Sequence, residues 1–232
     1  MSVSTMLHPG GTLPGLFSIA SGRQVYFAKG NLYYYNSGWY FDANQWDTHT
    51  DNPATSGSPH YYIPWSEIAT ASETPVIFST VNGASGVNFR VMTKSEWEYL
   101  LGLTSGRSTY SSSGHFYFKG TVHSKFGLII LPDNWEDSWY SSVPDDSYNN
   151  TGSINITVRD DDWTDLEAQG CVFLPVCGVV SGPGIDITSY GFYWSASASG
   201  MNLSGLEFWP GGLEICTGKK YGGMSVRLVV VK

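Results

Sequence analysis

Basic residues, cysteines and long apolar runs are all scarce in this chain of 232 residues. Its 12 lysine and arginine residues stand against 20 aspartate and glutamate residues, which gives a formal net charge of −8. Proteins that bind nucleic acid need a basic footprint to neutralise phosphates, so the composition argues against that class. The longest apolar stretches, such as residues 128–131 and 228–231, are far shorter than the ~18 to 20 residues of a membrane span, and we expect no membrane insertion.

The three cysteines, at positions 171, 177 and 216, are too few for a disulfide framework in a chain of this length. On one extended strand Cys171 and Cys177 would lie about 20 Å apart, which is too far to bridge. We therefore expect three reduced thiols. The first residues, MSVSTMLHPGG, contain neither a basic nor an apolar segment, so no signal peptide is visible. The localisation stays open between a phage particle, the cytoplasm and a cell surface reached by another route.

Charged residues make up only 14% of the chain, whereas aromatic residues reach 15%. Such an aromatic content supplies a core and excludes a disordered chain. The surface must then consist largely of Ser, Thr, Asn, Gly and the edges of aromatic rings. The length suits one mixed or all-β domain. We predict a single domain over residues 15–232, preceded by an N-terminal arm over residues 1–14.

One short helix is predicted over residues 94–101. Thr93 and Glu96 form a T-x-x-E capping box, in which each side chain accepts a hydrogen bond from the other's backbone N–H. Gly102 supplies the left-handed residue that commonly ends a helix.

A second helix is expected over about residues 158–168, with Thr157 as a candidate cap, three consecutive aspartates near the positive helix start and Gly170 at the end. The remaining apolar runs predict strands. They lie at residues 16–21, 24–35, 115–118, 127–131, 171–177, 191–195, 206–209, 213–216 and 225–231. Two short helices and many strands indicate an α+β fold dominated by antiparallel sheet.

Six motifs that occur in a fixed order along the sequence resemble those of a known protein family. They are VYFAKGNLYY (25–34), TKSEWEYLL (93–101), GLIILPDNW (127–135), DWTDLEAQGCVFLPVCG (162–178), SYGFYWSAS (189–197) and YGGMSVRLVVV (221–231). The set resembles paralogous surface domains of gut Bacteroidales and Fibrobacter, which are related to the C-type lectin-like fold in its formylglycine-generating-enzyme branch. It is also similar to the variable proteins of diversity-generating retroelements. The resemblance implies a C-type lectin-like fold in which the first and last strands pair.

In those variable proteins the C-terminal part of the fold is rewritten by mutagenic reverse transcription, and the resemblance places this segment at about residues 194–226. Framework positions such as Trp194 and Arg227 match the family. The positions between them are implied to contact ligand. They are Ala198, Met201, Asn202, Ser204, Glu207, Trp209, Glu214, Thr217 and Tyr221.

Strand alternation gives a physical reason for this division. Leu206 and Phe208 point to one side of a strand, and Glu207 and Trp209 point to the other. Pro210 and the glycines after it then turn the chain. We predict that the second side is exposed and forms a contact surface that combines a rigid aromatic ring with small polar residues. The alternative is that a loop covers Trp209 and Met201, which would then serve packing.

Signals for enzyme chemistry are weak. The sequence contains no nucleophile elbow, phosphate-binding loop or zinc-protease motif, and its five histidines are scattered. Cys171 and Cys177 resemble the paired cysteines of formylglycine-generating enzymes, but they flank an apolar run and are read as core residues. Arg227 is expected to hold a carboxylate or backbone carbonyls.

No cofactor is predicted. The acidic pair Asp145 and Asp146 and the triplet at residues 160–162 offer oxygen ligands that suit calcium. For the triplet, the positive start of a helix is the simpler interpretation.

The sequence therefore predicts a non-enzymatic binding protein, a diversified receptor-binding or adhesion protein of a gut bacterium or its phage. Its partner would be a protein or a surface glycan, and homo-oligomers would add avidity. The alternative is a non-diversified surface or carbohydrate-binding module. A third hypothesis, an oxidase-like enzyme, requires a cysteine that is accessible at a cleft.

Overall fold

A computed structural model describes residues 8–49, 59–70, 72–84, 86–104, 113–181, 184–186, 189–199, 202–219 and 222–232. They form a mixed α+β structure of mostly antiparallel strands, which confirms the predicted class. The described residues form three short α-helices, one more than predicted: α1 (Trp65–Ile68), α2 (Lys94–Leu100) and α3 (Asp160–Ala168). None of the helices in this part of the chain has the length and apolar character to cross a membrane.

The strands gather into five small sheets. The first contains β1 (Phe17–Ala20), β2 (Arg23–Phe27) and β14 (Val229–Val231), and the second pairs β3 (Leu32–Tyr35) with β4 (Gly38–Phe41). The third has the order β7 (Ile156–Thr157), β5 (Tyr117–Val122), β6 (Lys125–Ile130) and β8 (Val172–Pro175). The fourth pairs β9 (Val179–Ser181) with β10 (Gly184–Asp186), and the fifth contains β11 (Gly191–Ser199), β12 (Asn202–Trp209) and β13 (Gly212–Lys219).

The two ends of the chain meet in the first sheet. Strand β14 runs antiparallel to β2, with Val229 opposite Phe27 and Val231 opposite Val25. The last strand thus pairs with the second strand, β2, and the segments VYFAKG (25–30) and SVRLVV (225–230) are neighbours, as the resemblance implies. The end of the predicted N-terminal arm also packs here, since Leu13 is buried and its N–H donates to the Phe27 carbonyl at 2.8 Å.

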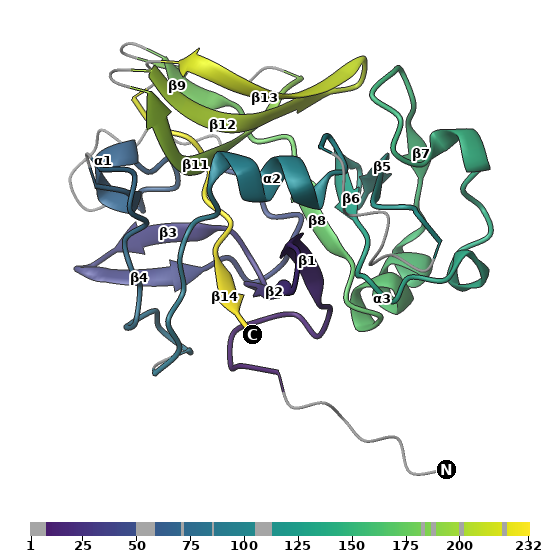
Figure 1. The fold of residues 1–232 in the computed structure, drawn as a ribbon, viewed down its shortest axis with the longest axis horizontal. Coiled ribbons are helices and arrows are strands. Elements are labelled where there is room, and N and C mark those ends of the chain that lie inside the picture. Colours follow the sequence, from purple (N-terminus) through teal and green to yellow (C-terminus); the bar gives the residue numbers. More distant parts are fainter. Residues whose placement is uncertain are drawn as a thin grey trace.

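Helix α2 lies between this sheet and the sheet of β11, β12 and β13 (Figure 1). Its capping box is present: the Glu96 N–H donates to Thr93 Oγ1 at 3.3 Å, and the Thr93 N–H donates to Glu96 Oε2 at 2.9 Å. Gly102 follows with φ +67°, which confirms the predicted left-handed stop. Trp97 and Leu100 face the central core.

Helix α3 begins later than its sequence suggests. The N-cap is Arg159 and no side chain caps the helix, so the prediction that Thr157 caps it was wrong. The three aspartates do occupy the first turn, where the positive end of the helix favours them, and the Arg159 guanidinium pairs with Asp162 at 2.9 Å. Gly170 has φ +96° just past the end. The first turn is thus stabilised by charge.

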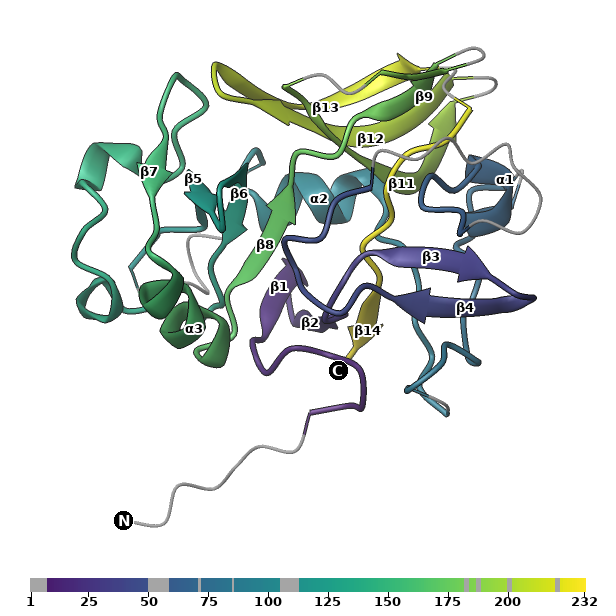
Figure 2. The ribbon, with the colours of Figure 1, turned by 180° about the vertical axis from the view of Figure 1, so that it is seen from behind.

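Three hydrophobic clusters fill the spaces between these elements. The central cluster surrounds α2, the second lies under β3, β4 and α1, and the third lies between the β5–β8 sheet and α3. Figure 2 shows the third sheet and α3 on the side of the molecule away from β3 and β4. Tryptophans anchor each cluster, with Trp97 in the first, Trp194 in the second, and Trp135 and Trp163 in the third.

Candidate ligand-contact surface

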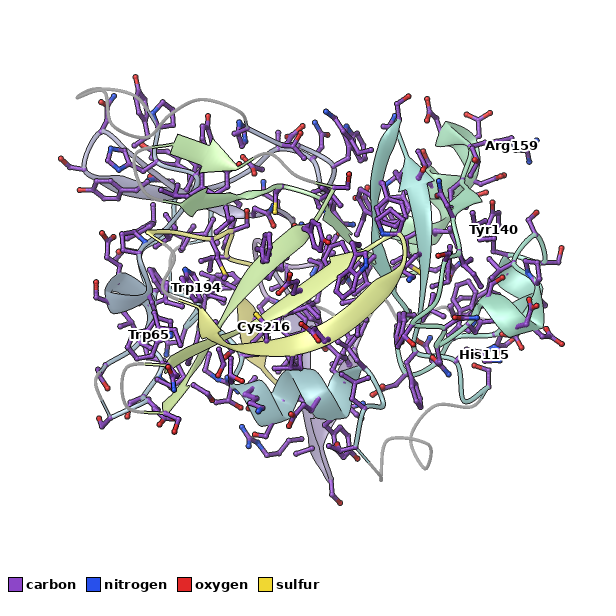
Figure 3. The ribbon with its side chains drawn as sticks, turned by 90° about the horizontal axis from the view of Figure 1, so that it is seen from above. Trp65, His115, Tyr140, Arg159, Trp194 and Cys216 are labelled. Atoms are coloured by element: carbon purple, nitrogen blue, oxygen red, sulfur yellow. The ribbon has the colours of Figure 1, made fainter. Side chains whose placement is uncertain are left out.

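The segment expected to contact ligand forms the sheet of β11, β12 and β13. One side of this sheet packs on the central cluster, because Leu206 lies opposite both Tyr193 and Ile215 in register, and Phe208 lies opposite Leu213. These apolar positions confirm that Leu206 and Phe208 point into the core. Figure 3, a view from above, shows β12 and β13 as the pale yellow strands side by side across the middle of the picture.

Seven of the nine predicted contact residues are described, and five of them reach the surface. Asn202, Glu214 and Thr217 are exposed, whereas Ala198 and Trp209 are half-buried. Met201 and Tyr221 lie outside the described residues. We call the five accessible side chains the contact surface.

The expectation that Ser204 and Glu207 are exposed was wrong. Ser204 is 2% exposed and Glu207 is 6% exposed. Both belong to β12, the central strand of the sheet, and neither side of that strand is open along its middle. Phe192 lies directly opposite Glu207 and packs into the second hydrophobic cluster. Alternation separates the two sides of a strand correctly, but it does not reveal that both are covered.

A buried lysine fixes the turn between β12 and β13. Lys119 of β5 is fully buried, and its Nζ donates to the Pro210 carbonyl at 3.1 Å and to the Thr151 carbonyl at 3.2 Å. The same atom also donates to the Trp209 carbonyl at 3.5 Å and to the Gly152 carbonyl. Burial lowers the pKa of Lys119 to about 8. One ammonium group thus ties the turn to the third sheet.

The aromatic member of the contact surface is held on two sides. The Trp209 ring lies 5.3 Å from the ring of Tyr190, which in turn stacks on buried Phe192. Gly212 lies directly opposite Trp209, and a Cβ at that glycine would approach the indole to 2.1 Å. The packing alternative for Trp209 is therefore partly correct, because the ring packs and stays half-accessible.

Sequence reasoning missed Lys119 and Tyr190. A signal for Lys119 was available, since it is the one charged residue in the run HFYFKGTV. A lysine at such a position must either end the strand or find buried acceptors. Tyr190 had no local signal, because it precedes β11 and its partner Trp209 lies at the end of β12.

A cavity of about 300 Å³ opens beside the same turn. Its lining residues are Thr48, His49, Ser124, Lys125, Phe126, Val176, Cys177, Ser189 and Pro210. His49 Nε2 lies 2.9 Å from Asp42 Oδ1, and the Tyr62 hydroxyl donates to the His49 carbonyl at 2.8 Å. Burial, opposed by the contact with His49, raises the pKa of Asp42. His49 is thus fixed in the wall of the cavity, whereas Phe126, Val176 and Pro210 make part of the wall apolar.

The cysteines are buried and unpaired by disulfides, as predicted. Cys177 lines the cavity but is only 6% exposed, and its thiol is directed to the Phe192 carbonyl at 3.8 Å. Burial raises the pKa of both Cys171 and Cys177. Neither thiol has the lowered pKa of an activated nucleophile.

Arg227 holds backbone carbonyls and amide oxygens. It is 1% exposed, and its guanidinium donates to the Phe173 carbonyl at 3.0 Å and to Asn31 Oδ1 at 2.9 Å. Further donors reach the Ala28 carbonyl and Gln45 Oε1. This confirms the expected hold on backbone carbonyls and ties the segment just before β14 to three other parts of the chain.

In the described ranges, no group of three or more His, Cys, Asp and Glu side chains that could hold a metal ion comes together. Asp145 and Asp146 lie in a 3-10 helix (Asp145–Ser147), and a second 3-10 helix spans Asp137–Trp139.

Comparison of the chain with protein-family models, with curated proteins and with solved structures gives no match.

Proposed function

We propose that this chain is a non-enzymatic binding protein that presents the contact surface on a C-type lectin-like scaffold, in the role of a receptor-binding or adhesion protein of a gut bacterium or its phage. The observation that carries the proposal is the anchoring of the β12–β13 turn by Lys119 beneath side chains that stay accessible. A fixed backbone with free side chains is the arrangement that a binding surface needs.

Rigidity of the backbone favours affinity because binding then costs less conformational entropy. The sheet is held from below by Leu206 and Phe208, and its turn is held by Lys119. Replacing exposed side chains such as Asn202 and Thr217 would therefore change the contacts with a ligand without moving the strands. This tolerance is what a diversified surface requires.

The chemistry of the contact surface also supports a binding role. Trp209 offers a large ring that its neighbours already hold in place, so its burial by a ligand costs little side-chain entropy. Asn202 and Thr217 supply donors and acceptors, and Glu214 supplies a charge. The ligand would be a protein or a surface glycan, and assembly into multiples would add avidity.

Two observations support the proposal of a lectin-like scaffold: the six sequence motifs and one feature of the strand topology. The pairing of β14 with β2 closes the chain on itself, as the resemblance implies. Residues of the motifs also occupy the centres of the hydrophobic clusters, for example Trp97, Trp163 and Trp194.

The proposal is tested with fluorescently labelled full chain on intact gut Bacteroidales cells and on a glycan array. The test variant combines Asn202→Ala, Glu214→Ala and Thr217→Ala. The matched control combines Asn134→Ala, Glu136→Ala and Ser138→Ala, which change the same kinds of exposed side chain around a 3-10 helix.

Both variants should unfold at the temperature of the unmodified chain, because all six side chains are exposed. The test variant should lose at least tenfold in affinity, and the control should bind as the unmodified chain does. Equal binding by the two variants, or no binding by the unmodified chain to any cell or glycan, would contradict the proposal.

A further inference from the structure

The two-stranded sheet of β3 and β4 carries a row of aromatic rings that the proposed contact surface does not use. Tyr34 lies directly opposite Trp39 in register. On its other side, Tyr34 exchanges two backbone hydrogen bonds with His60, at 3.0 and 2.8 Å. Residues opposite one another on neighbouring strands share a face, so the three rings form one row.

The rings in this row stand at steep angles and do not form a flat stack. The Tyr34 and Trp39 centroids are 4.9 Å apart at an interplanar angle of 59°, and those of Tyr34 and His60 are 6.3 Å apart at 85°. Phe78 supports Trp39 edge-on from 5.1 Å. The opposite face of the sheet is stiffened by its own rings, with Tyr33 stacked on Tyr40. The row is therefore held in place.

A cavity of about 390 Å³ lies against the row. Its lining consists of Tyr34, Trp39, His60, Ile63, Pro64 and Glu67. The volume is within the range of small-molecule sites, which is about 300 to 1,000 Å³. Tyr34 and Trp39 are half-buried, and His60 and Glu67 are exposed, so a ligand can enter from solvent.

The floor of the cavity is anchored to the core. Ile63 is 1% exposed, and its N–H donates to the Met224 carbonyl at 2.9 Å while its own carbonyl accepts the Trp194 indole N–H at 2.7 Å. The adjacent helix α1 is tied down by Trp65, whose indole donates to the Ser195 carbonyl at 2.9 Å. Trp65 and Trp194 lie close together in Figure 3. The cavity is thus preformed, which lowers the entropic cost of binding.

Charge decides which ligand suits these walls. Glu67 is the single carboxylate of the lining, and no lysine or arginine is among the lining residues. Within the described ranges, no basic side chain pairs with Glu67. An anionic ligand would meet an uncompensated carboxylate, and the faces of aromatic rings are also electronegative. Both features favour a cation.

We propose that this cavity binds an alkylated ammonium group. Such a cation is weakly hydrated and spreads its charge over methyl groups, which pack against the faces of Trp and Tyr. A simple ammonium keeps a strong hydration shell and needs several acceptors at close range. Tyr34 and Trp39 form the aromatic walls, and Glu67 supplies the countercharge at the mouth. None of the lining residues belongs to the contact surface, and the proposal does not depend on the proposed function.

The test titrates tetramethylammonium and choline into the full chain and follows binding by calorimetry and by tryptophan fluorescence. Both cations should bind saturably. The neutral isostere 3,3-dimethyl-1-butanol has the shape of choline without its charge and should bind at least tenfold more weakly. If the isostere binds as tightly as choline, the site recognises the apolar shape of the ligand and not its charge. That result would overturn the proposal.

Two variants locate the site. Glu67→Gln keeps the shape of an exposed side chain and removes its charge, so choline should bind at least fivefold more weakly, while the matched control Glu73→Gln should bind it unchanged. Tyr34→Leu should abolish choline binding, and circular dichroism checks that this variant is folded. If Tyr34→Leu does not fold, the result for Glu67→Gln alone tests the proposal. Unchanged binding by Glu67→Gln, or saturable binding of methyl glucoside tighter than that of choline, would overturn the proposal.

Further arms identify the natural source of the group. Phosphatidylcholine vesicles and a peptide that contains trimethyllysine present the same chemistry. Co-sedimentation with the vesicles indicates a lipid headgroup, and binding of the peptide alone indicates a modified protein. Choline binding with neither of them indicates a free metabolite, and each of these three results supports the cation site.

Discussion

The ammonium group of Lys119 donates to the carbonyl of Pro210 at 3.1 Å, so that a strand of the third sheet holds the turn of the contact surface. The two residues are 91 positions apart in the chain. Lys119 also donates to the backbone carbonyls of Thr151, Gly152 and Trp209. The scaffold and the contact surface are therefore coupled through one side chain.

The first prediction concerns Lys119→Met, which keeps the length of the side chain and removes its donor. Hydrogen bonds to charged groups contribute about 1.5 to 3 kcal/mol each, and the substitution would leave four part-buried contacts to carbonyls unmade. The free energy of unfolding, measured with urea, should fall by roughly 2 kcal/mol or more. Lys125→Met changes an exposed lysine at the start of β6 and should have little effect. Equal effects of the two substitutions would contradict the anchoring role.

The second prediction concerns the pH dependence of the same group. The folded protein holds the pKa of Lys119 at about 8, below its ordinary value of 10.5. Between these two values the unfolded chain keeps the proton that the folded chain has lost, so stability rises with pH across this window. From pH 7.5 to 9.5 the unmodified chain should gain stability relative to Lys119→Met. A constant difference between the two proteins would show that the lysine does not titrate there.

The third prediction concerns the ion pair at the start of α2. Glu96 is 4% exposed, and its carboxylate binds Arg90 at 2.7 Å and Arg23 at 3.0 Å. Burial raises the pKa of this carboxyl, but the hydrogen bonds from Arg90 and Thr93 outweigh it and leave the pKa below the ordinary 4.5. The stabilisation is therefore present above that value and is lost as the pH falls through the lower pKa of the folded state.

Glu96→Gln should accordingly be less stable than the unmodified chain at pH 7, by roughly 2 to 4 kcal/mol, because two arginines lose their partner. The difference should shrink when the pH is lowered below 4.5. Thermal unfolding monitored at several pH values measures it. Glu98→Gln removes only a partly exposed pair with Lys94 at 3.8 Å and serves as the control. A pH-independent difference would contradict the assignment.

The fourth prediction concerns the thiols. Cys171, Cys177 and Cys216 are all buried, and burial raises the pKa of the first two. Native protein should show no rapid reaction with a thiol reagent at pH 7.5, and all three cysteines should react in denaturant. Cys177 lines a cavity and is the most informative of the three. Rapid labelling of Cys177 in the native state would revive the oxidase-like hypothesis.

Local signals in the sequence were sufficient to predict α2, because the capping box and Gly102 act within a few residues of the helix. They were insufficient for α1. This helix is a single turn between Pro64 and Ala69, and it is held by the hydrogen bond from Trp65 to the distant Ser195 carbonyl. A contact between residues that are far apart in the sequence leaves no hydrophobic periodicity in a segment as short as α1.

The contact surface was predicted only in part for the same reason. Alternation along β12 places Leu206 and Phe208 correctly, since that pattern is local. The burial of Glu207 depends on Phe192 in a neighbouring strand, and the position of the turn depends on Lys119. The hairpin turn between β5 and β6 also lacks a local sequence signal. His123 and Ser124 form this turn with positive φ at both residues, although they lack the Asn-Gly pattern that predicts such a turn.

Deep sequencing of this locus in a population of cells shows whether the contact surface is diversified, because diversification must leave a pattern of substitutions. We predict a nearby reverse transcriptase and a template repeat that differs from the coding segment only at adenines. Substitutions should fall on the codons of Asn202, Trp209, Glu214 and Thr217 and should spare buried Leu206, Phe208 and Glu207. A substitution rate over residues 198–221 equal to that of the rest of the chain, with no template repeat, would contradict it.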